Sequence, residues 1–255
     1  MTQRFAGKVA LVTGAGGGMG NAEALMLAEG GARVICQDID ADTCRATVED
    51  IERAGGAAQA LVSDIADVAA FRAAVAGFDR ELDGIDILVN NHGIGGGDLS
   101  LEQIDEANYD RLFAVNTKAV FFASQAVVAS MKRKHWGRII NVSSMVPIRG
   151  WPTNSQYSGA KLALIGFARS WALELGPHGI TVNTVVPGIT IPGMATKAWT
   201  QEQRDAFLKA FPVPLGRLAH VSDVARLVGF FASAEADFLT GQAMTPSGGS
   251  FVGAL

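Results

Sequence analysis

The chain has 255 residues, 49% of them hydrophobic and 18% charged, with a formal net charge of −4 and 30 glycines. High hydrophobicity with low net charge excludes a disordered protein. The glycines have no three-residue period and there are only eight prolines, which excludes a collagen-like chain. Because the balance is mildly acidic and no long basic run occurs, we expect neither nucleic acid nor an anionic membrane as a partner.

Cysteine use and the N-terminus indicate the compartment. The two cysteines, Cys36 and Cys44, have no paired Cys/His spacing, so we expect no disulfide framework and no metal site. The longest uncharged stretch, residues 175–196, contains three prolines and four glycines, which would break a membrane-spanning helix. The N-terminus lacks the apolar segment of a signal peptide. We therefore expect a soluble, cytoplasmic protein.

Strand-length apolar runs alternate with helical patterns along the chain. The runs are 9–12, 32–36, 57–62, 85–89, 138–142 and 180–186, and the helical patterns are 18–30, 42–54, 67–80, 101–134 and 154–176. Near-continuous apolar strands are typical of a parallel sheet covered on both faces. The alternation predicts a single doubly wound, Rossmann-type α/β domain over residues 1–255.

Residues 189–221 interrupt this alternation. They begin and end with Pro/Gly signals and enclose one short helical stretch at 200–211. An insertion of this length after the carboxyl end of a strand predicts a lid over a substrate site. A helix at 223–231 and a short strand at 242–245 are expected to complete the domain.

A glycine-rich loop follows the first predicted strand. Residues 13–20 read Thr-Gly-Ala-Gly-Gly-Gly-Met-Gly and lead into a helical pattern. A pyrophosphate needs backbone N–H groups at close range and a helix N-terminus, and side chains would obstruct both. A flexible loop is the alternative, but the strand–loop–helix context favours dinucleotide binding.

Asp38 follows the second predicted strand, 18 residues after Gly20. A carboxylate there can accept hydrogen bonds from an adenosine ribose and would repel a 2′-phosphate. Neither Gln37, Ile39 nor Gly17 supplies a compensating cation, so NAD is favoured over NADP. The alternative is that Asp38 caps the next helix, with Asp40 and Asp42 as rival caps. Asp64 ends the third strand and could bind the adenine amino group or cap a helix.

Several motifs in the same order resemble the short-chain dehydrogenase/reductase family, in its branch of about 250 residues, over nearly the whole chain. Residues 13–20 match TGxxxGxG, and Asn90-Asn91-His92-Gly93 resembles NNAG with His92 in place of alanine. Ser144 stands 13 residues before Tyr157, and Tyr157 to Lys161 fits YxxxK. Asn116 matches the catalytic asparagine. Residues 183–188 and 214–217 match the stretches that end the sixth strand and the lid.

The resemblance implies roles for these residues. Asn116, Ser144, Tyr157 and Lys161 would be catalytic, with Lys161 bonding the nicotinamide ribose and Asn116 holding a water on a proton path. The implied cofactor contacts are Gly14, Gly17, Gly18, Met19, Gly20, Asp38, Asp64, Ile65, Asn91, Gly93, Tyr157, Lys161, Pro187, Gly188 and Thr190. The family also suggests a homotetramer, or a homodimer, built on the helices near 101–134 and 154–176.

Tyr157 and Lys161 are four residues apart and share one helix face. An ammonium beside a phenol favours phenolate, so we expect Lys161 to lower the pKa of Tyr157. Such a phenol can take the proton of an alcohol while a hydride leaves the carbinol carbon, or return it during ketone reduction. Ser144 can hydrogen-bond the substrate oxygen.

Residues near Ser144 and in the lid predict a largely apolar substrate pocket. Its candidates are His92, Met145, Arg149, Trp151, Met194 and Trp199. His92 could instead be structural, and Arg149 could anchor an anion or face solvent. Two further departures from the family are Pro192, where a threonine is frequent, and Ser247, where an aspartate is usual.

The leading hypothesis is an NAD-dependent oxidoreductase that interconverts a secondary alcohol and its ketone. A 3-oxoacyl-thioester reductase is the main alternative, and a catalytically silent NAD-binding module is another. Nucleotide-sugar epimerases or dehydratases usually have a separate C-terminal substrate domain, for which this chain is too short.

Overall fold

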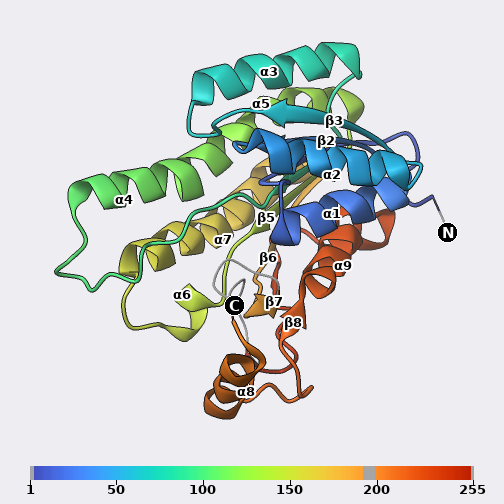
Figure 1. Ribbon diagram of the computed structural model, residues 1–255. Coiled ribbons are helices and arrows are strands. Elements are labelled where there is room, and N and C mark those ends of the chain that lie inside the picture. Colours follow the sequence, from blue (N-terminus) through green and yellow to red (C-terminus); the bar gives the residue numbers. More distant parts are fainter. Residues whose placement is uncertain (1–2, 192–198, 254–255) are drawn as a thin grey trace.

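The computed structural model describes residues 3–191 and 199–253. Its centre is a seven-stranded parallel sheet in the order β3-β2-β1-β4-β5-β6-β9 (Figure 1). The strands are β1 (Val9–Thr13), β2 (Arg33–Asp38), β3 (Ala57–Val62), β4 (Ile87–Asn90), β5 (Gly137–Val142), β6 (Ile180–Val185) and β9 (Ala243–Met244). The strand order reverses between β1 and β4, and ligands of such sheets bind at the carboxyl ends of the strands at this point.

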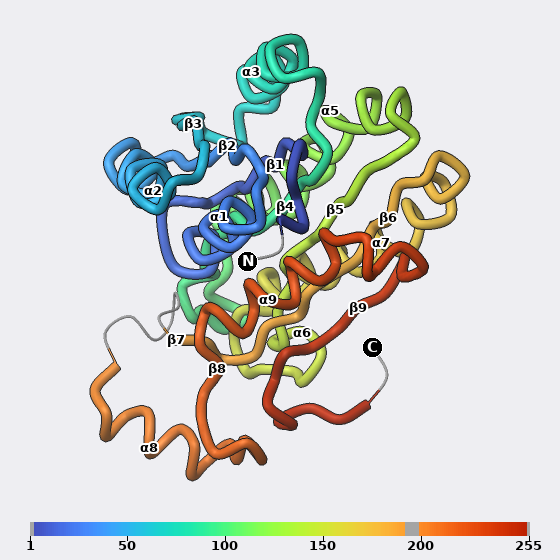
Figure 2. The backbone as a smooth tube through the Cα atoms, turned by 90° about the vertical axis from the view of Figure 1, so that its right-hand side faces the viewer, coloured from blue at the N-terminus to red at the C-terminus, as the bar shows by residue number. Residues whose placement is uncertain are grey.

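Helices cover both faces of the sheet. One face carries α1 (Gly18–Glu29), α2 (Ala41–Arg53) and α9 (Val221–Ala232), and the other carries α3 (Val68–Glu81), α5 (Ala119–Lys134) and α7 (Ser155–Leu175) (Figure 2). Every residue of β1, β5 and β6 is buried, because helices pack on both sides of these central strands. The doubly wound fold predicted from the apolar runs is therefore confirmed.

The long helical pattern predicted over 101–134 is divided in the structure. Helix α4 (Glu106–Phe113) passes through a π-helical turn, Ala114–Lys118, into α5. The run Glu106–Lys134 is long and apolar enough to cross a membrane by length and composition alone. The apolar side of this run is part of the core, however, since Val120, Val127 and Met131 of α5 are fully buried. Packing against the sheet thus accounts for its apolar composition.

The predicted lid leaves the sheet after β6. Strand β7 (Thr190–Ile191) pairs with β8 (Ala219–His220), and this two-stranded ladder closes the base of the insertion. Between them lies α8 (Gln201–Ala210), whose N-terminus is a capping box made by Thr200 and Gln203. A short helix, α6 (Val146–Arg149), follows β5. The sequence predicted neither α6 nor the β7–β8 pair, because two- to four-residue elements have no readable period.

Candidate active site

The glycine-rich loop joins β1 to α1 and leaves the N-terminus of α1 open. Gly17 is the N-cap, no side chain caps the helix, and the first turn contains no acidic residue. A Cβ atom at Gly20 would lie 2.1 Å from the carbonyl oxygen of Gly14, so the turn cannot accept a side chain there. Free N–H groups at a helix start, with no side chains in the way, fit a pyrophosphate.

A groove of about 730 Å³ extends from this loop along the carboxyl ends of β1, β2, β3 and β4. Most of the predicted cofactor contacts line it: Gly14, Gly17, Gly18, Met19, Asp38, Asp64, Ile65, Asn91 and Gly93. The Asn91 side chain braces the loop by donating to the carbonyl oxygens of Thr13 and Gly14, at 3.0 and 3.1 Å. The size and lining of the groove fit a dinucleotide cofactor. Sequence reasoning missed Arg111, which reaches the groove from α4.

Asp38 belongs to the groove and not to a helix cap. Its Oδ2 accepts a 2.8 Å hydrogen bond from the backbone N–H of Gly16. The N-cap of α2 is Asp40, whose side chain accepts from the N–H groups of Asp42 and Thr43. Asp64 likewise lines the groove, while Asp67 caps α3. The capping alternative for Asp38 and Asp64 is thus excluded by the residues that occupy those caps.

Ser144 and Tyr157 meet where β5 ends and α7 begins. The side chain of Ser144 lies close enough to the Tyr157 hydroxyl to influence its pKa through a hydrogen bond. Lys161, one turn further along α7, is buried and donates from Nζ to the carbonyl oxygens of Val142 (3.0 Å) and His92 (3.4 Å). Two of its three N–H groups are therefore committed to backbone, and one remains for another acceptor.

The expected effect of Lys161 on Tyr157 does not appear in this arrangement. Burial raises the pKa of Tyr157, and the Ser144 hydrogen bond opposes that rise. The Lys161 ammonium is directed at backbone carbonyls, and its own pKa falls to about 8 because it is buried. Without a bound cofactor, the tyrosine is thus a neutral acid held in place by Ser144.

Asn116 lies within the π-helical turn between α4 and α5 and is fully buried. Its carboxamide pairs with the backbone of Ile94, accepting from its N–H at 2.8 Å and donating to its carbonyl oxygen at 2.9 Å. A Cβ atom at Gly93 would lie 3.1 Å from Lys161 Nζ and 3.3 Å from Asn116 Oδ1. The missing side chain of Gly93 therefore allows Asn116 and Lys161 to approach the same point.

His92 does not reach the substrate side and is a brace instead. Its Nδ1 lies 2.7 Å from the hydroxyl oxygen of Thr13, and its Nε2 lies 3.0 Å from the carbonyl oxygen of Val115. Burial lowers its pKa to about 3, which keeps the ring neutral. His92 thus connects the end of β1 to the π-helical turn that carries Asn116. Its prediction as a substrate-pocket residue is corrected, because both ring nitrogens already have protein partners.

A second, narrower pocket of about 80 Å³ opens beside Ser144. Met145, Arg149 and Trp151 line it as predicted, and so do Pro187 and Gly188, which were expected at the cofactor. Trp199 stacks on Phe207 of α8, and Met194 lies outside the described residues. Val146, which also flanks Ser144, lines the pocket too, and sequence reasoning missed several further lining residues, most of them from residues 189–221: Phe207, Phe211, Val213, Leu218, Ala219, Ser247 and Ser250.

Four predicted cofactor contacts line neither hollow: Gly20, Thr190, and the two α7 residues Tyr157 and Lys161. Gly20 is buried beneath the glycine-rich loop, and Thr190 is buried in β7. Within residues 3–191 and 199–253, no group of three His, Cys, Asp or Glu side chains is arranged to hold a metal ion.

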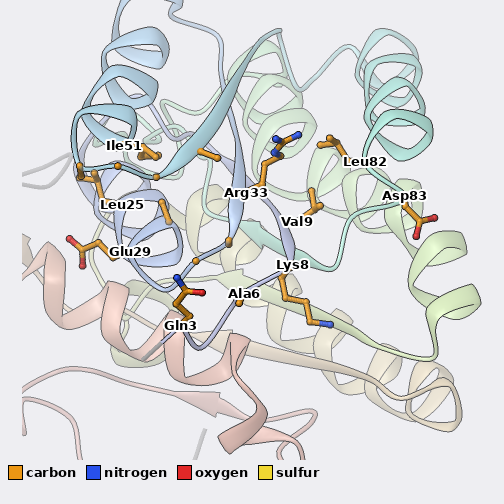
Figure 3. A pocket seen from close by; sticks show the side chains of 18 of the residues that line it. Gln3, Ala6, Lys8, Val9, Leu25, Glu29, Arg33, Ile51, Leu82 and Asp83 are labelled. Carbon is orange, nitrogen blue, oxygen red and sulfur yellow. The ribbon is translucent and has the colours of Figure 1, made fainter. Parts of the chain in front are cut away.

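Another hollow, of about 770 Å³, lies at the opposite edge of the sheet (Figure 3). Its lining includes Lys8, Glu29, Arg33 and Asp83 together with glycines that end helices. None of the residues with a predicted role lines it. The chemistry of the chain is therefore concentrated at the carboxyl edge, although the two large hollows are of similar size.

Glu23 of α1 is an unexpected buried acid. It is fully buried, and neither carboxylate oxygen has a hydrogen-bond partner. Burial raises its pKa to about 8, against an opposing effect of the Lys161 ammonium. Glu23 is therefore mostly protonated at neutral pH. Its burial could not be predicted from the sequence, since Glu is ordinary on an amphipathic helix.

This acid makes stability depend on pH in a defined window. The folded pKa of Glu23 is raised from 4.5, so the folded protein holds a proton that the unfolded chain releases, and stability falls as pH rises towards about 8. The lowered pKa of His92 makes stability rise with pH, but only below about pH 6.5. The lowered pKa of Lys161 does the same only above about pH 8. Between pH 6.5 and 8 we expect the free energy of unfolding to fall by about 2 kcal/mol.

Urea unfolding of Glu23→Gln across this range should remove that slope, because the amide does not titrate. Glu29→Gln is the matched control, since Glu29 is exposed on the same helix. An unchanged slope in Glu23→Gln would show that Glu23 is not the titrating group.

The parallel sheet, the open helix N-terminus and the Ser144–Tyr157–Lys161 group together define a dinucleotide-binding oxidoreductase domain. Residues 8–203 match the family model for short chain dehydrogenases. The chain belongs to this family.

Curated relatives and solved structures match this chain along nearly its whole length. A 3-oxoacyl-[acyl-carrier-protein] reductase FabG from Vibrio cholerae is 39% identical over 96% of this chain and 98% of its own. A (2S)-[(R)-hydroxy(phenyl)methyl]succinyl-CoA dehydrogenase subunit BbsD from Thauera aromatica is 37% identical over 95% of this chain and 96% of its own. The crystal structure of a Sinorhizobium meliloti protein assigned as a short-chain alcohol dehydrogenase has a TM-score of 0.89, with 31% identity and 98% of each chain covered.

Proposed function

We propose that this protein transfers a hydride reversibly between a secondary alcohol and NAD, giving the ketone and NADH. The observation that carries the proposal is that Ser144, which lines the narrow pocket, lies close enough to the Tyr157 hydroxyl to oppose the rise in its pKa. Ser144 lines the narrow pocket, while Lys161, next along α7, contacts His92 in the wall of the groove. A substrate oxygen beside Ser144 would therefore lie next to the cofactor groove.

Each catalytic side chain has a separate task in this proposal. When bound, the nicotinamide ring supplies the hydride acceptor and a positive charge. Ser144 donates a hydrogen bond to the substrate oxygen and holds it at the Tyr157 hydroxyl. Tyr157 takes the hydroxyl proton during oxidation and returns it during reduction. The remaining N–H of Lys161 binds a ribose hydroxyl or water, and Asn116 keeps the π-helical turn beside it.

Asp38 supports NAD over NADP. Its carboxylate is held at the groove by the Gly16 N–H, where a 2′-phosphate would meet a negative charge. Arg111 lines the groove from α4, in the company of Ala114 and Val115 of the adjoining π-helical turn. We therefore assign the preference for NAD over NADP to Asp38.

A second candidate is the reduction of a 3-oxoacyl thioester. It is favoured by the names of the relatives, several of which are 3-oxoacyl-[acyl-carrier-protein] reductases. The reacting group is the same in both candidates, a ketone carbonyl or its alcohol, so Ser144 and Tyr157 would act alike. The candidates differ in what is attached to that group.

The test is turnover measured as absorbance at 340 nm. Purified protein is given NAD with a panel of secondary alcohols, and separately NADH or NADPH with acetoacetyl-CoA. Oxidation of a panel alcohol supports the first candidate, and faster turnover of acetoacetyl-CoA supports the second. No turnover of either, with NADH binding retained, would indicate a silent NAD-binding module and contradict the proposal.

We also propose a homotetramer in the cytoplasm. Helices α5 and α7 together present an apolar face in which the rings of Phe121, Phe167 and Trp171 are in contact, and Phe121 is 37% exposed. Such a face is suited to a second copy of the chain. Light scattering that gave a single-chain mass of 26.6 kDa would exclude the tetramer.

The cytoplasmic location is supported by two free cysteines.

A further inference from the structure

A run of aromatic rings connects the catalytic serine's surroundings to the lid. Trp151, after α6, contacts Phe211 with ring centroids 5.6 Å apart, and Phe211 contacts Phe207 at 4.8 Å. Phe207 in turn contacts Trp199 at 5.2 Å. Phe207, Phe211 and Trp151 all line the narrow pocket beside Ser144. Part of the pocket wall is therefore aromatic, and aliphatic side chains make up much of the rest.

Arg149 is the single cationic residue in the lining of this pocket as the structure describes it. Its guanidinium lies over the Phe211 ring, 4.5 Å from the centroid, which holds the charge at the pocket rim. Among the described residues it makes no ion pair, and the pocket lining contains no carboxylate to neutralise it. An exposed positive charge is thus placed at the edge of an apolar pocket without a counter-charge among the described residues.

The remaining polar groups of the pocket cannot supply that counter-charge. They are the hydroxyls of Ser144, Ser247 and Ser250. Ser247 is notable because an aspartate, which would bring a negative charge to this wall, was expected at its position from the family pattern. An arginine fork beside an apolar wall is suited to a planar anion such as a carboxylate, or to a phosphate.

We propose that the substrate of this site combines a flat apolar group, seated against Trp151, Phe207 and Phe211, with an anionic group bound by Arg149. The proposal rests on the oxidoreductase function proposed above and specifies its substrate class. The anion is either a carboxylate of the substrate itself or a phosphate of a carrier arm, since both offer the same charged oxygens to a guanidinium.

Ligand binding tests the proposal without requiring turnover. Calorimetry with the full chain in the presence of NADH compares 3-phenylpropanoate, its neutral amide and butanoate. We expect the phenyl acid to bind about 10- to 100-fold more tightly than the amide, which lacks the charge. It should also bind more tightly than butanoate, which lacks the ring. Equal affinity for acid and amide would overturn the anionic half of the proposal, and equal affinity for phenyl acid and butanoate the apolar half.

Variants show whether Arg149 is the anchor. Arg149→Met should bring the acid to the affinity of the amide, and Arg149→Lys should recover part of the difference because it keeps the charge. Arg72→Met is the matched control, since Arg72 is exposed on α3, on the far side of the fold. A preference for the acid that survives in Arg149→Met would overturn the role of Arg149 even where both ligands bind.

Turnover then separates the two sources of the anion. 3-Hydroxy-3-phenylpropanoate is compared with its methyl ester, which lacks the carboxylate. 3-Hydroxybutanoyl-CoA is compared with the N-acetylcysteamine thioester of 3-hydroxybutanoate, which lacks the carrier phosphates. A loss of kcat/KM in Arg149→Met confined to the free acid identifies a carboxylate, and a loss confined to the CoA ester identifies a carrier phosphate. If Arg149→Met changes kcat/KM equally for charged and neutral substrates, the inference is overturned. If no substrate is turned over while the acid still binds, only the proposed function is contradicted.

Discussion

Replacing Tyr157 by phenylalanine is expected to lower kcat by about 10²- to 10⁴-fold, the usual contribution of a positioned general acid or base. The phenyl ring keeps the packing of a side chain that is half-buried on α7 but removes the hydroxyl that bonds to Ser144. NADH binding, followed by fluorescence, should change little because the groove is lined by other residues. The rate is measured as NADH formation with the best alcohol of the panel.

The chain supplies its own control for this experiment, since it has two tyrosines. Tyr109 lies in α4 and stacks on Phe113 with centroids 4.4 Å apart, away from Ser144. Tyr109→Phe should therefore retain full activity. A Tyr157→Phe protein that turned over at the wild-type rate would refute the assignment of Tyr157 as the proton carrier.

Removing the charge of Asp38 is expected to weaken NADH binding by about 10- to 100-fold, the effect of losing hydrogen bonds to a charged group. Asp38→Asn is the informative change, because the amide oxygen can still accept from the Gly16 N–H and keep the loop in place. NADPH binding should improve at the same time, since a 2′-phosphate no longer meets a carboxylate. Adding Ile39→Arg, which supplies a cation at the same strand end, should shift the preference further towards NADPH.

Fluorescence titration of both cofactors measures this shift. Asp42→Asn is the control, because Asp42 is exposed in the first turn of α2 and does not line the groove. A wild-type protein that binds NADPH as tightly as NADH would contradict the role given to Asp38.

Much of this site could be predicted from local sequence. The glycine-rich loop was recognisable because a tight strand–loop–helix turn requires bare backbone within eight consecutive residues. Tyr157 and Lys161 were recognisable because a helix places residues four apart on one face. The central strands were evident since strands covered on both faces are continuously apolar. In each case the physical constraint acts between neighbours in the chain.

Other features were decided only by contacts between distant segments. Glu23 is buried because α1 packs against the sheet and α9, and nothing in its helix distinguishes it from an exposed glutamate. His92 became a brace because folding brings Thr13 to one of its ring nitrogens and Val115 to the other. Phe207 and Phe211 line the pocket beside Ser144 because the segment after β7 folds back onto Trp151.

The sequence by itself therefore determined the parallel sheet and the edge of it where the glycine-rich loop and the proposed reacting side chains lie, all of which follow from short-range backbone and helix geometry. Tertiary structure decided the burial of charge and the walls of the substrate pocket. Burial and pocket shape depend on which faces of separate elements meet, and the amphipathic pattern of one element does not specify its partner. Arg149 was a pocket candidate from the sequence, but its contact with Phe211, the residue that ends α8, was decided only by tertiary structure.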